Sequence, residues 1–246
     1  KDLPLLERLQ FLSIVTSNFD EFFQVRVASV KRRNFAGITE EDVSALTPKN
    51  LLQKISERAH EIIQKQNDCL MLDVLPKLAK KGIEYVNPLE YTERQKDFLS
   101  SVFRNEVYPL LTPLRTDTEY FPPVLNLIQY AAFFLTPMAG IHVENNALEG
   151  KADAPKIALV QIPSAVSQVI WLPSENGNKT FALLSDVIVN FGRQLFPGFE
   201  VSETLVFKVA RDADFAVNEE VRNNSDEKET EDFIHEMEKV LLQRKS

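Results

Sequence analysis

The sequence predicts an all-α part followed by an α+β part, with the change near Pro109. Up to Pro109, apolar residues recur at spacings of three and four, which is typical of amphipathic helices. Beyond Pro109, short apolar runs are bounded by Pro, Gly and Asn, which is typical of strands. We therefore expect an N-terminal helical bundle over residues 1–108. A second domain over residues 109–246 should hold a small mixed sheet and flanking helices.

Two helices are expected first, over residues 4–15 and 17–33. The second should begin at Ser17, because a serine followed three residues later by Asp20 is a variant of the capping box. Its apolar residues repeat at i, i+3, i+4, i+8 and i+11 and form one stripe. They are Phe19, Phe22, Phe23, Val27 and Val30.

A long third helix should follow a polar loop at residues 34–47. Thr47 and Pro48 suit its N-cap and its first residue. Pro76 should kink or restart this helix, and Gly82 should end it.

A short extended segment at residues 83–86 then leads to another helix. Thr92 and Gln95 form its capping box, and Pro109 ends it.

The second part should contain four or five strands and two helices. Apolar runs at residues 124–135, 157–162, 169–172, 181–184 and 204–209 predict the strands. Helices are expected from Ser185 to Leu195 and over residues 226–245. Residues 143–155 are polar and without periodicity, so we expect a loop there.

Composition excludes several classes of protein. The 246 residues have a net charge of −8 and a pI near 5.1, which argues against a general binder of nucleic acid or of membrane surfaces. The single Cys69 excludes an intrachain disulfide and fits a reducing compartment. No apolar run is long enough to span a membrane, and the first residues lack the layout of a signal peptide.

The residue that stands out for binding is Asn18. At a helix start, free backbone amides can bind an anion or a polar ring edge, and Asn18 offers a side-chain donor and acceptor. Most such residues only terminate helices, so spacing alone favours a structural role. The basic run Lys31-Arg32-Arg33 is explained by cations at a helix C-terminus. For Arg26, phosphate binding and a structural role are equally open.

Several segments resemble the ATP-dependent polyphosphate kinases (family 1). Residues 7–12 (ERLQFL), 17–22 (SNFDEF) and 25–28 (VRVA) are similar to the N-terminal region of that family. The similarity to its head domain rests on residues 110–114 (LLTPL), 120–126 (YFPPVLN), 160–164 (VQIPS) and 207–214 (FKVARDAD). The resemblance therefore covers nearly the whole chain, as the helical domain plus the head domain.

This resemblance implies a function for the full-length enzyme. It would transfer the γ-phosphate of ATP reversibly to polyphosphate through a phosphohistidine, with Mg²⁺ as cofactor. Asn18 would line the nucleotide pocket near the adenine, with Arg26 as a supporting residue. The phosphohistidine and the metal ligands would lie in C-terminal catalytic domains beyond Ser246. No catalytic residue and no metal ligand are therefore expected in this chain, which should be inactive alone.

The resemblance also implies partners and a location. ATP, ADP and polyphosphate are the expected ligands, and a homodimer or higher homo-oligomer is the expected assembly. The location would be the cytoplasm of a bacterial cell. No nucleic-acid partner is expected, and peripheral association with a membrane stays open.

The residues themselves agree with a non-catalytic role. None of the three histidines, His60, His142 and His235, lies in a basic, glycine-rich context, and the chain has no glycine-rich phosphate loop. The alternative is a helical scaffold or protein-interaction module without a ligand, in which SNFDEF is only a capped core helix.

Overall fold

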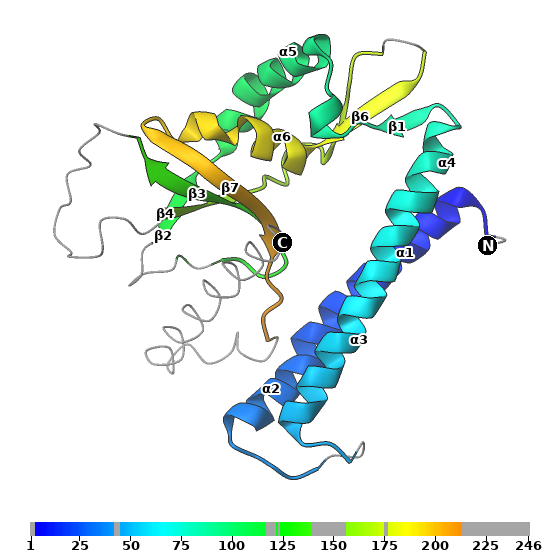
Figure 1. Ribbon diagram of the computed structural model, residues 1–246, viewed down its shortest axis with the longest axis vertical. Coiled ribbons are helices and arrows are strands. Elements are labelled where there is room, and N and C mark those ends of the chain that lie inside the picture. The colour runs from blue at the N-terminus through cyan, green and yellow to red at the C-terminus, as the bar shows by residue number, and fades with distance from the viewer. Residues whose placement is uncertain are drawn as a thin grey trace. The chain divides into compact units, whose positions relative to one another are not determined.

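The structure, a computed structural model, describes residues 3–41, 45–116, 122, 124–138, 156–174 and 177–212. By their contacts, the residues form two compact units, and Figure 1 labels most of their helices and strands. The first unit comprises Lys1–Ser100, Ser167–Leu183 and Ala210–Ala216, and the second comprises the remainder. The domain boundary expected between residues 108 and 109 stays a prediction, because units defined by contacts need not be folding domains. The loop expected at 143–155 and the helix expected at 226–245 lie outside the described residues.

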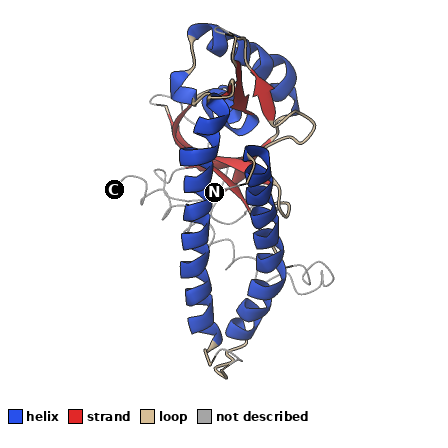
Figure 2. Cartoon of the chain, turned by 90° about the vertical axis from the view of Figure 1, so that its right-hand side faces the viewer, coloured by secondary structure: helices blue, strands red, loops and turns tan. Residues whose placement is uncertain are grey.

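The first unit contains two helical rods that lie side by side (Figure 2). The first rod is continuous through α1 (Leu5–Glu21), the π-helical turn η1 (Phe22–Val27) and α2 (Ala28–Phe35). The second rod runs through α3 (Pro48–Cys69), the π-helical turn η2 (Leu70–Val74) and α4 (Leu75–Ala79).

The predicted signals of the second rod are confirmed. Thr47 caps α3, since its Oγ1 accepts a hydrogen bond from the backbone N–H of Asn50 at 3.4 Å, and Pro48 is the first helical residue. Pro76 lies in the first turn of α4, directly after the π turn. Gly82 follows the end of α4 with φ of +81°, which glycine adopts readily.

The predicted helix start at Ser17 is wrong. The backbone N–H of Phe22 donates to the carbonyl oxygens of Asn18 and Phe19, so the helix runs through this segment and Ser17 caps nothing. Thr16 Oγ1 donates to the carbonyl oxygen of Leu12 at 3.1 Å, a bond that hydroxyl side chains also form inside helices. With no Gly or Pro between residues 5 and 35, nothing in the sequence forces a break.

A small mixed sheet belongs to the first unit. It holds β1 (Ile83–Tyr85), β6 (Lys179–Leu183) and β5 (Val169–Trp171) in that order, with β1 parallel and β5 antiparallel to β6. The short helix η3 (Pro88–Glu90) and α5 (Glu93–Val102) follow β1. The capping box of α5 is confirmed: the Thr92 N–H donates to Gln95 Oε1 at 3.1 Å, and the Gln95 N–H donates to Thr92 Oγ1 at 3.3 Å.

The second unit contains a four-stranded antiparallel sheet. Its order is β2 (Pro113–Thr116), β4 (Lys156–Gln161), β3 (Gln129–Pro137), β7 (Phe199–Lys208). The sequence did not predict β2, where Pro and Arg interrupt the apolar pattern. The strand expected from residue 124 begins only at Gln129, because Leu127 turns the chain with φ of +58°.

Residues 130–135 of β3 are all buried because both faces of this strand are covered. One face packs in a cluster with Val124, Ile157, Leu159 and Leu205. The other is covered by α6 (Leu184–Phe191) and the 3-10 turn η6 (Gly192–Leu195), while η4 (Phe103–Val107) and η5 (Tyr108–Leu110) precede the sheet. The predicted class, a helical part followed by mixed sheets with flanking helices, is thus confirmed.

Gly192 makes the closest approach to the central strand. A Cβ atom at this position would lie 2.5 Å from Cζ and 2.8 Å from Cε1 of the Phe133 ring. Phe133 is fully buried, and its ring centroid lies 5.1 Å from that of Phe196. The ring therefore has little room to move away.

We expect Gly192→Ala to lower the free energy of unfolding by about 1–3 kcal/mol, the usual range for overpacking a core. Urea or thermal unfolding measures the change. The double variant Gly192→Ala, Phe133→Leu should lose less stability than the sum of the two single variants, since a smaller side chain makes room for the methyl group. Additive losses would show that the contact is not what requires glycine.

Candidate functional site

One face of the first rod exposes a row of apolar side chains. Phe11, Ile14, Phe22 and Val25 are 59%, 48%, 36% and 47% exposed. With Asn18 they recur at intervals of three and four residues, which places all five on one side of a helix. We call these five residues the outer stripe. No residue of α1, which is described in full, is buried.

Asn18 lies at the centre of the outer stripe. It is exposed, and its side-chain amide forms no hydrogen bond with any described residue. The amide therefore presents one acceptor and two donor hydrogens to the surroundings. Because Asn18 lies inside α1, its neighbouring backbone amides are used in helical bonds. The expected binding site at a helix N-terminus does not exist there, and only the side chain remains for recognition.

Arg26 follows Asn18 by eight residues, with Phe22 midway between them. Positions i, i+4 and i+8 form a row along a helix surface. Arg26 lies in the π turn, is exposed, and has no hydrogen-bond or ion-pair partner in the described ranges. The row Asn18–Phe22–Arg26 thus presents an amide, an aromatic ring and a cation, in this order along the helix.

The ring of Phe22 is supported from below by other aromatic rings. Its centroid lies 5.8 Å from that of Phe23 with an interplanar angle of 77°, an edge-to-face contact. Phe23 in turn stacks on Phe19, with centroids 6.1 Å apart and an angle of 25°. Phe19 and Phe23 are half-buried, and Phe23 restricts the exposed ring of Phe22 from one side.

The inner side of α1 is fastened to the second rod by hydrogen bonds. Gln66 Nε2 donates to the carbonyl oxygen of Leu12 at 2.7 Å and to Thr16 Oγ1 at 2.6 Å. These bonds fix the rotation of α1 about its own axis. The outer stripe is consequently turned away from α3.

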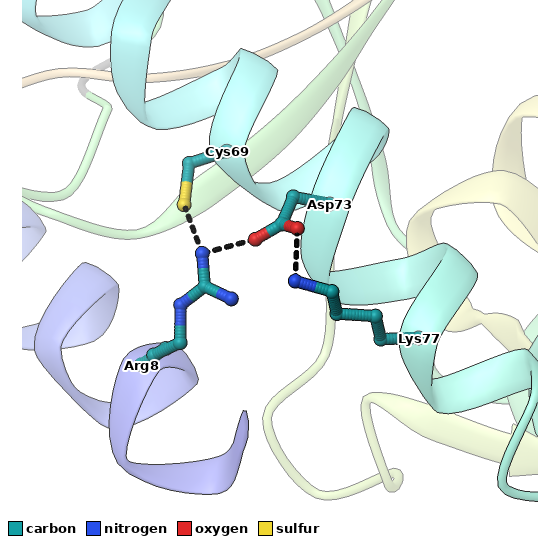
Figure 3. A pocket seen from close by; sticks show the side chains of 4 residues that line it. All are labelled: Arg8, Cys69, Asp73 and Lys77. Atoms are coloured by element: carbon teal, nitrogen blue, oxygen red, sulfur yellow. Dashed lines mark hydrogen bonds and ion pairs between the residues drawn. The ribbon is translucent and has the colours of Figure 1, made fainter. Parts of the chain in front are cut away.

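A charged cluster fastens the same two rods near the start of α1 (Figure 3). It lines an open depression of about 450 Å³ formed by Arg8, Cys69, Asp73 and Lys77. The Arg8 guanidinium donates to the Asp73 carboxylate, and Lys77 Nζ lies 2.5 Å from Asp73 Oδ1. The hydrogen bond from Lys77, and then that from Arg8, hold the pKa of Asp73 below the ordinary 3.8 of an aspartate despite some desolvation. The cations and the anion satisfy one another, so the cluster is structural.

The basic run at the end of α2 is also structural. Arg32 pairs with Asp212, which follows β7 in the sequence segment FKVARDAD. Arg33 Nη2 donates to the carbonyl oxygen of Glu40 at 3.3 Å. Both arginines lie in the last turn of α2, as the structural interpretation of this run predicted. The pairing of residues 180 positions apart left no signal in the sequence.

In the described part of the chain, the one histidine interacts within its own helix, where its Nδ1 lies 3.5 Å from Ser56 Oγ. His60 is exposed on α3, with its Nδ1 2.7 Å from the carbonyl oxygen of Ser56; His142 and His235 lie outside the described residues. Within those ranges, no three His, Cys, Asp or Glu side chains gather as a metal site requires. None of the described helices combines the length and apolarity needed to cross a bilayer.

Comparison with known proteins gives one consistent result. Residues 1–86 match the family model "Polyphosphate kinase N-terminal domain", and residues 94–246 match "Polyphosphate kinase middle domain". The chain is similar to the polyphosphate kinases of Bacillus anthracis (38% identity over 244 residues) and Lactiplantibacillus plantarum (34% over 245 residues). These alignments cover 98% and 99% of this chain but 32% and 31% of the relatives, so the chain spans about a third of their length.

A solved structure agrees with these sequence matches. The crystal structure of polyphosphate kinase from Porphyromonas gingivalis is similar with a TM-score of 0.70 and 26% sequence identity. The match covers 86% of this chain and 30% of that one.

The Asp73 cluster predicts a stability that depends on pH. A carboxyl group with a pKa lower in the folded than in the unfolded state stabilises the fold fully above its unfolded pKa. That contribution is lost as the pH falls below about 4 and through the folded pKa. We expect Asp73→Asn to lose stability at neutral pH and to show a smaller further loss between pH 4 and pH 2. Chemical denaturation over this range measures both.

Glu61→Gln is the matched control, because it removes the exposed ion pair with Arg58 on α3, of which both side chains are more than half exposed. Surface pairs of this kind contribute little, so this variant should keep the acid sensitivity of the unsubstituted chain. Equal acid sensitivity in all three proteins would contradict the role of Asp73.

Proposed function

Because this chain belongs to the polyphosphate kinase family, matching its N-terminal and middle domains, we propose that it supplies the helical side of the enzyme's ATP pocket. The proposed reaction is reversible transfer of the γ-phosphate of ATP to polyphosphate through a phosphohistidine. In this proposal, Asn18 contacts the adenine and Arg26 the phosphates. The pocket is completed by parts of the enzyme outside this chain.

The observation that carries this proposal is the amide of Asn18. It lies in the middle of an exposed apolar stripe and has no partner among the described residues. An adenine edge has a ring nitrogen that accepts and an exocyclic amine that donates, and a carboxamide complements both. The flanking apolar side chains provide the dry surface that a flat, largely apolar ring requires.

Arg26 is proposed to contact the phosphates of the nucleotide. It follows Asn18 by eight residues, which corresponds to a rise of about 12 Å along a helix. A nucleotide whose base lies at Asn18 can therefore extend its phosphates toward Arg26. An unpaired guanidinium suits phosphate oxygens, because it offers several donors and a permanent charge.

The remaining parts of the proposal lie outside the described chain. We place the phosphohistidine and the Mg²⁺ ligands on other domains, since the described residues offer neither a positioned histidine nor a group of metal-binding side chains. We further propose a homodimer or higher homo-oligomer in the cytoplasm. ATP, ADP and polyphosphate are its ligands.

We expect Asn18→Ala to raise the KM for ATP about 5- to 150-fold in the polyphosphate kinase that contains this segment. This range corresponds to the loss of one or two hydrogen bonds, about 1–3 kcal/mol. The kcat should change less, because Asn18 acts on binding rather than at the phosphate. ATP saturation kinetics give both constants.

The melting temperature of Asn18→Ala should stay level or rise, since alanine is the better helix former at an exposed position. Ser17→Ala, one residue away and also exposed, is the control and should leave the KM for ATP unchanged. An unchanged KM in Asn18→Ala would remove the support for adenine recognition at this residue.

The 246-residue segment alone should show no phosphoryl transfer, because its described residues hold no placed nucleophile. Incubation with labelled ATP and Mg²⁺ should give neither labelled protein nor polyphosphate. An acid-labile phosphohistidine at His60, His142 or His235 would overturn this prediction.

A further inference from the structure

We infer that Phe22 stacks on the base of the bound nucleotide and forms, with Asn18, a two-part base site: a ring for the face and an amide for the edge. This inference rests on the proposed function, because it assumes that a nucleotide binds along the outer stripe. It gives Phe22 a role in the affinity for any flat base, whereas Asn18 distinguishes one base from another.

Position is the first reason. Phe22 follows Asn18 by four residues, so the two side chains are neighbours on the helix surface, with Cβ atoms about 5–6 Å apart. It also precedes Arg26 by four residues, which places it between the amide and the cation. A base stacked on Phe22 can therefore direct its edge to Asn18 and its phosphates to Arg26.

Preorganisation is the second reason. Phe22 is 36% exposed, yet the edge-to-face contact with Phe23 restricts the orientation of its ring before any ligand arrives. A ring that is already ordered loses little conformational entropy on binding. Exposed aromatic rings that are held in this way are the usual platforms for nucleobases, because every base has a π-face.

The other exposed ring of the stripe lacks this support. Phe11 is 59% exposed and has no ring contact in the described part of the chain. It also lies seven residues before Asn18, on the side away from Arg26. Phe22 is therefore distinguished from Phe11 by its contact with the ring of Phe23 and by its place in the row.

A fluorescence experiment tests stacking directly. Phe22→Trp, in the polyphosphate kinase that carries this segment, keeps an aromatic face at this position and adds an emission signal. Titration with ADP, without polyphosphate, should quench this emission as the base stacks on the indole. The signal of Trp171 and of any other tryptophan is subtracted with the unsubstituted enzyme.

Phe35→Trp is the matched control, because Phe35 ends α2 and is 74% exposed, away from the outer stripe. ADP should leave its emission unchanged. Absence of quenching in Phe22→Trp at ADP concentrations that saturate the enzyme would overturn the inference. Equal quenching in both variants would do the same, since it would reflect light absorption by the nucleotide.

Binding of ADP and GDP separates this inference from the proposed function. Phe22→Leu should weaken both nucleotides by a similar factor, about 5- to 150-fold, whereas Phe22→Tyr should bind both normally. Asn18→Ala should weaken ADP more than GDP. Unchanged binding in Phe22→Leu, with weakened ADP binding in Asn18→Ala, refutes stacking but leaves the ATP pocket intact.

The opposite pattern also has a clear meaning. Weakened binding in Phe22→Leu, with normal binding in Asn18→Ala, supports stacking and refutes edge recognition by Asn18. The melting temperature of each variant is measured as well. If Phe22→Leu is less stable, Phe22→Tyr and Phe22→Trp still test stacking, because both keep an aromatic ring next to Phe23.

Discussion

The rotation of α1 about its own axis is the constraint on which the candidate site depends. Gln66 holds the middle of α1 through Leu12 and Thr16, and Asp73 holds its start through Arg8. A helix fastened at two points cannot turn, so the residues between and beyond these points have fixed directions. The outer stripe faces away from the second rod because the opposite side of α1 provides the hydrogen-bonding groups.

The charged and polar side chains of the first unit discussed above fall into two groups. Arg8, Arg32 and Asp73 are engaged with partners on distant segments, and their contribution is to hold those segments together. Asn18 and Arg26 differ, since neither has a partner in the described ranges. Residues of the first group would have to share their charge between a ligand and an ion-pair partner, whereas residues of the second group lose only their hydration. This difference separates scaffold from candidate site among side chains that look alike in the sequence.

Much of the fold could be predicted from local signals. Thr47-Pro48, Thr92 with Gln95, and Gly82 each act through their own backbone neighbourhood, and each acts as predicted. The Ser17 signal failed because its pattern is compatible with a helix interior, where Thr16 bonds to Leu12 and Gln66. Strand β2 was missed because its pairing with β4, rather than its own composition, makes it a strand.

The candidate site was found in the sequence for a reason that the structure does not support. Asn18 stood out as a residue at a helix start, while the structure gives it importance as an exposed amide inside a helix. The family motif points to the same segment without depending on the local interpretation. The role proposed for Phe22 could not be predicted, since it depends on which aromatic rings of the motif face outward.

The π turn η1 explains where the outer stripe ends. In an unbroken α-helix, Ala28, ten residues after Asn18, would lie only about 80° from the direction of Asn18. A π turn accommodates one extra residue, which shifts the following positions by about 100° and brings Ala28 to the opposite side. Ala28 is accordingly buried, while Val25, three residues before it, is exposed. The outer stripe must therefore end within η1, and Arg26 stands at that end, where an elongated ligand lying along the stripe would leave the helix.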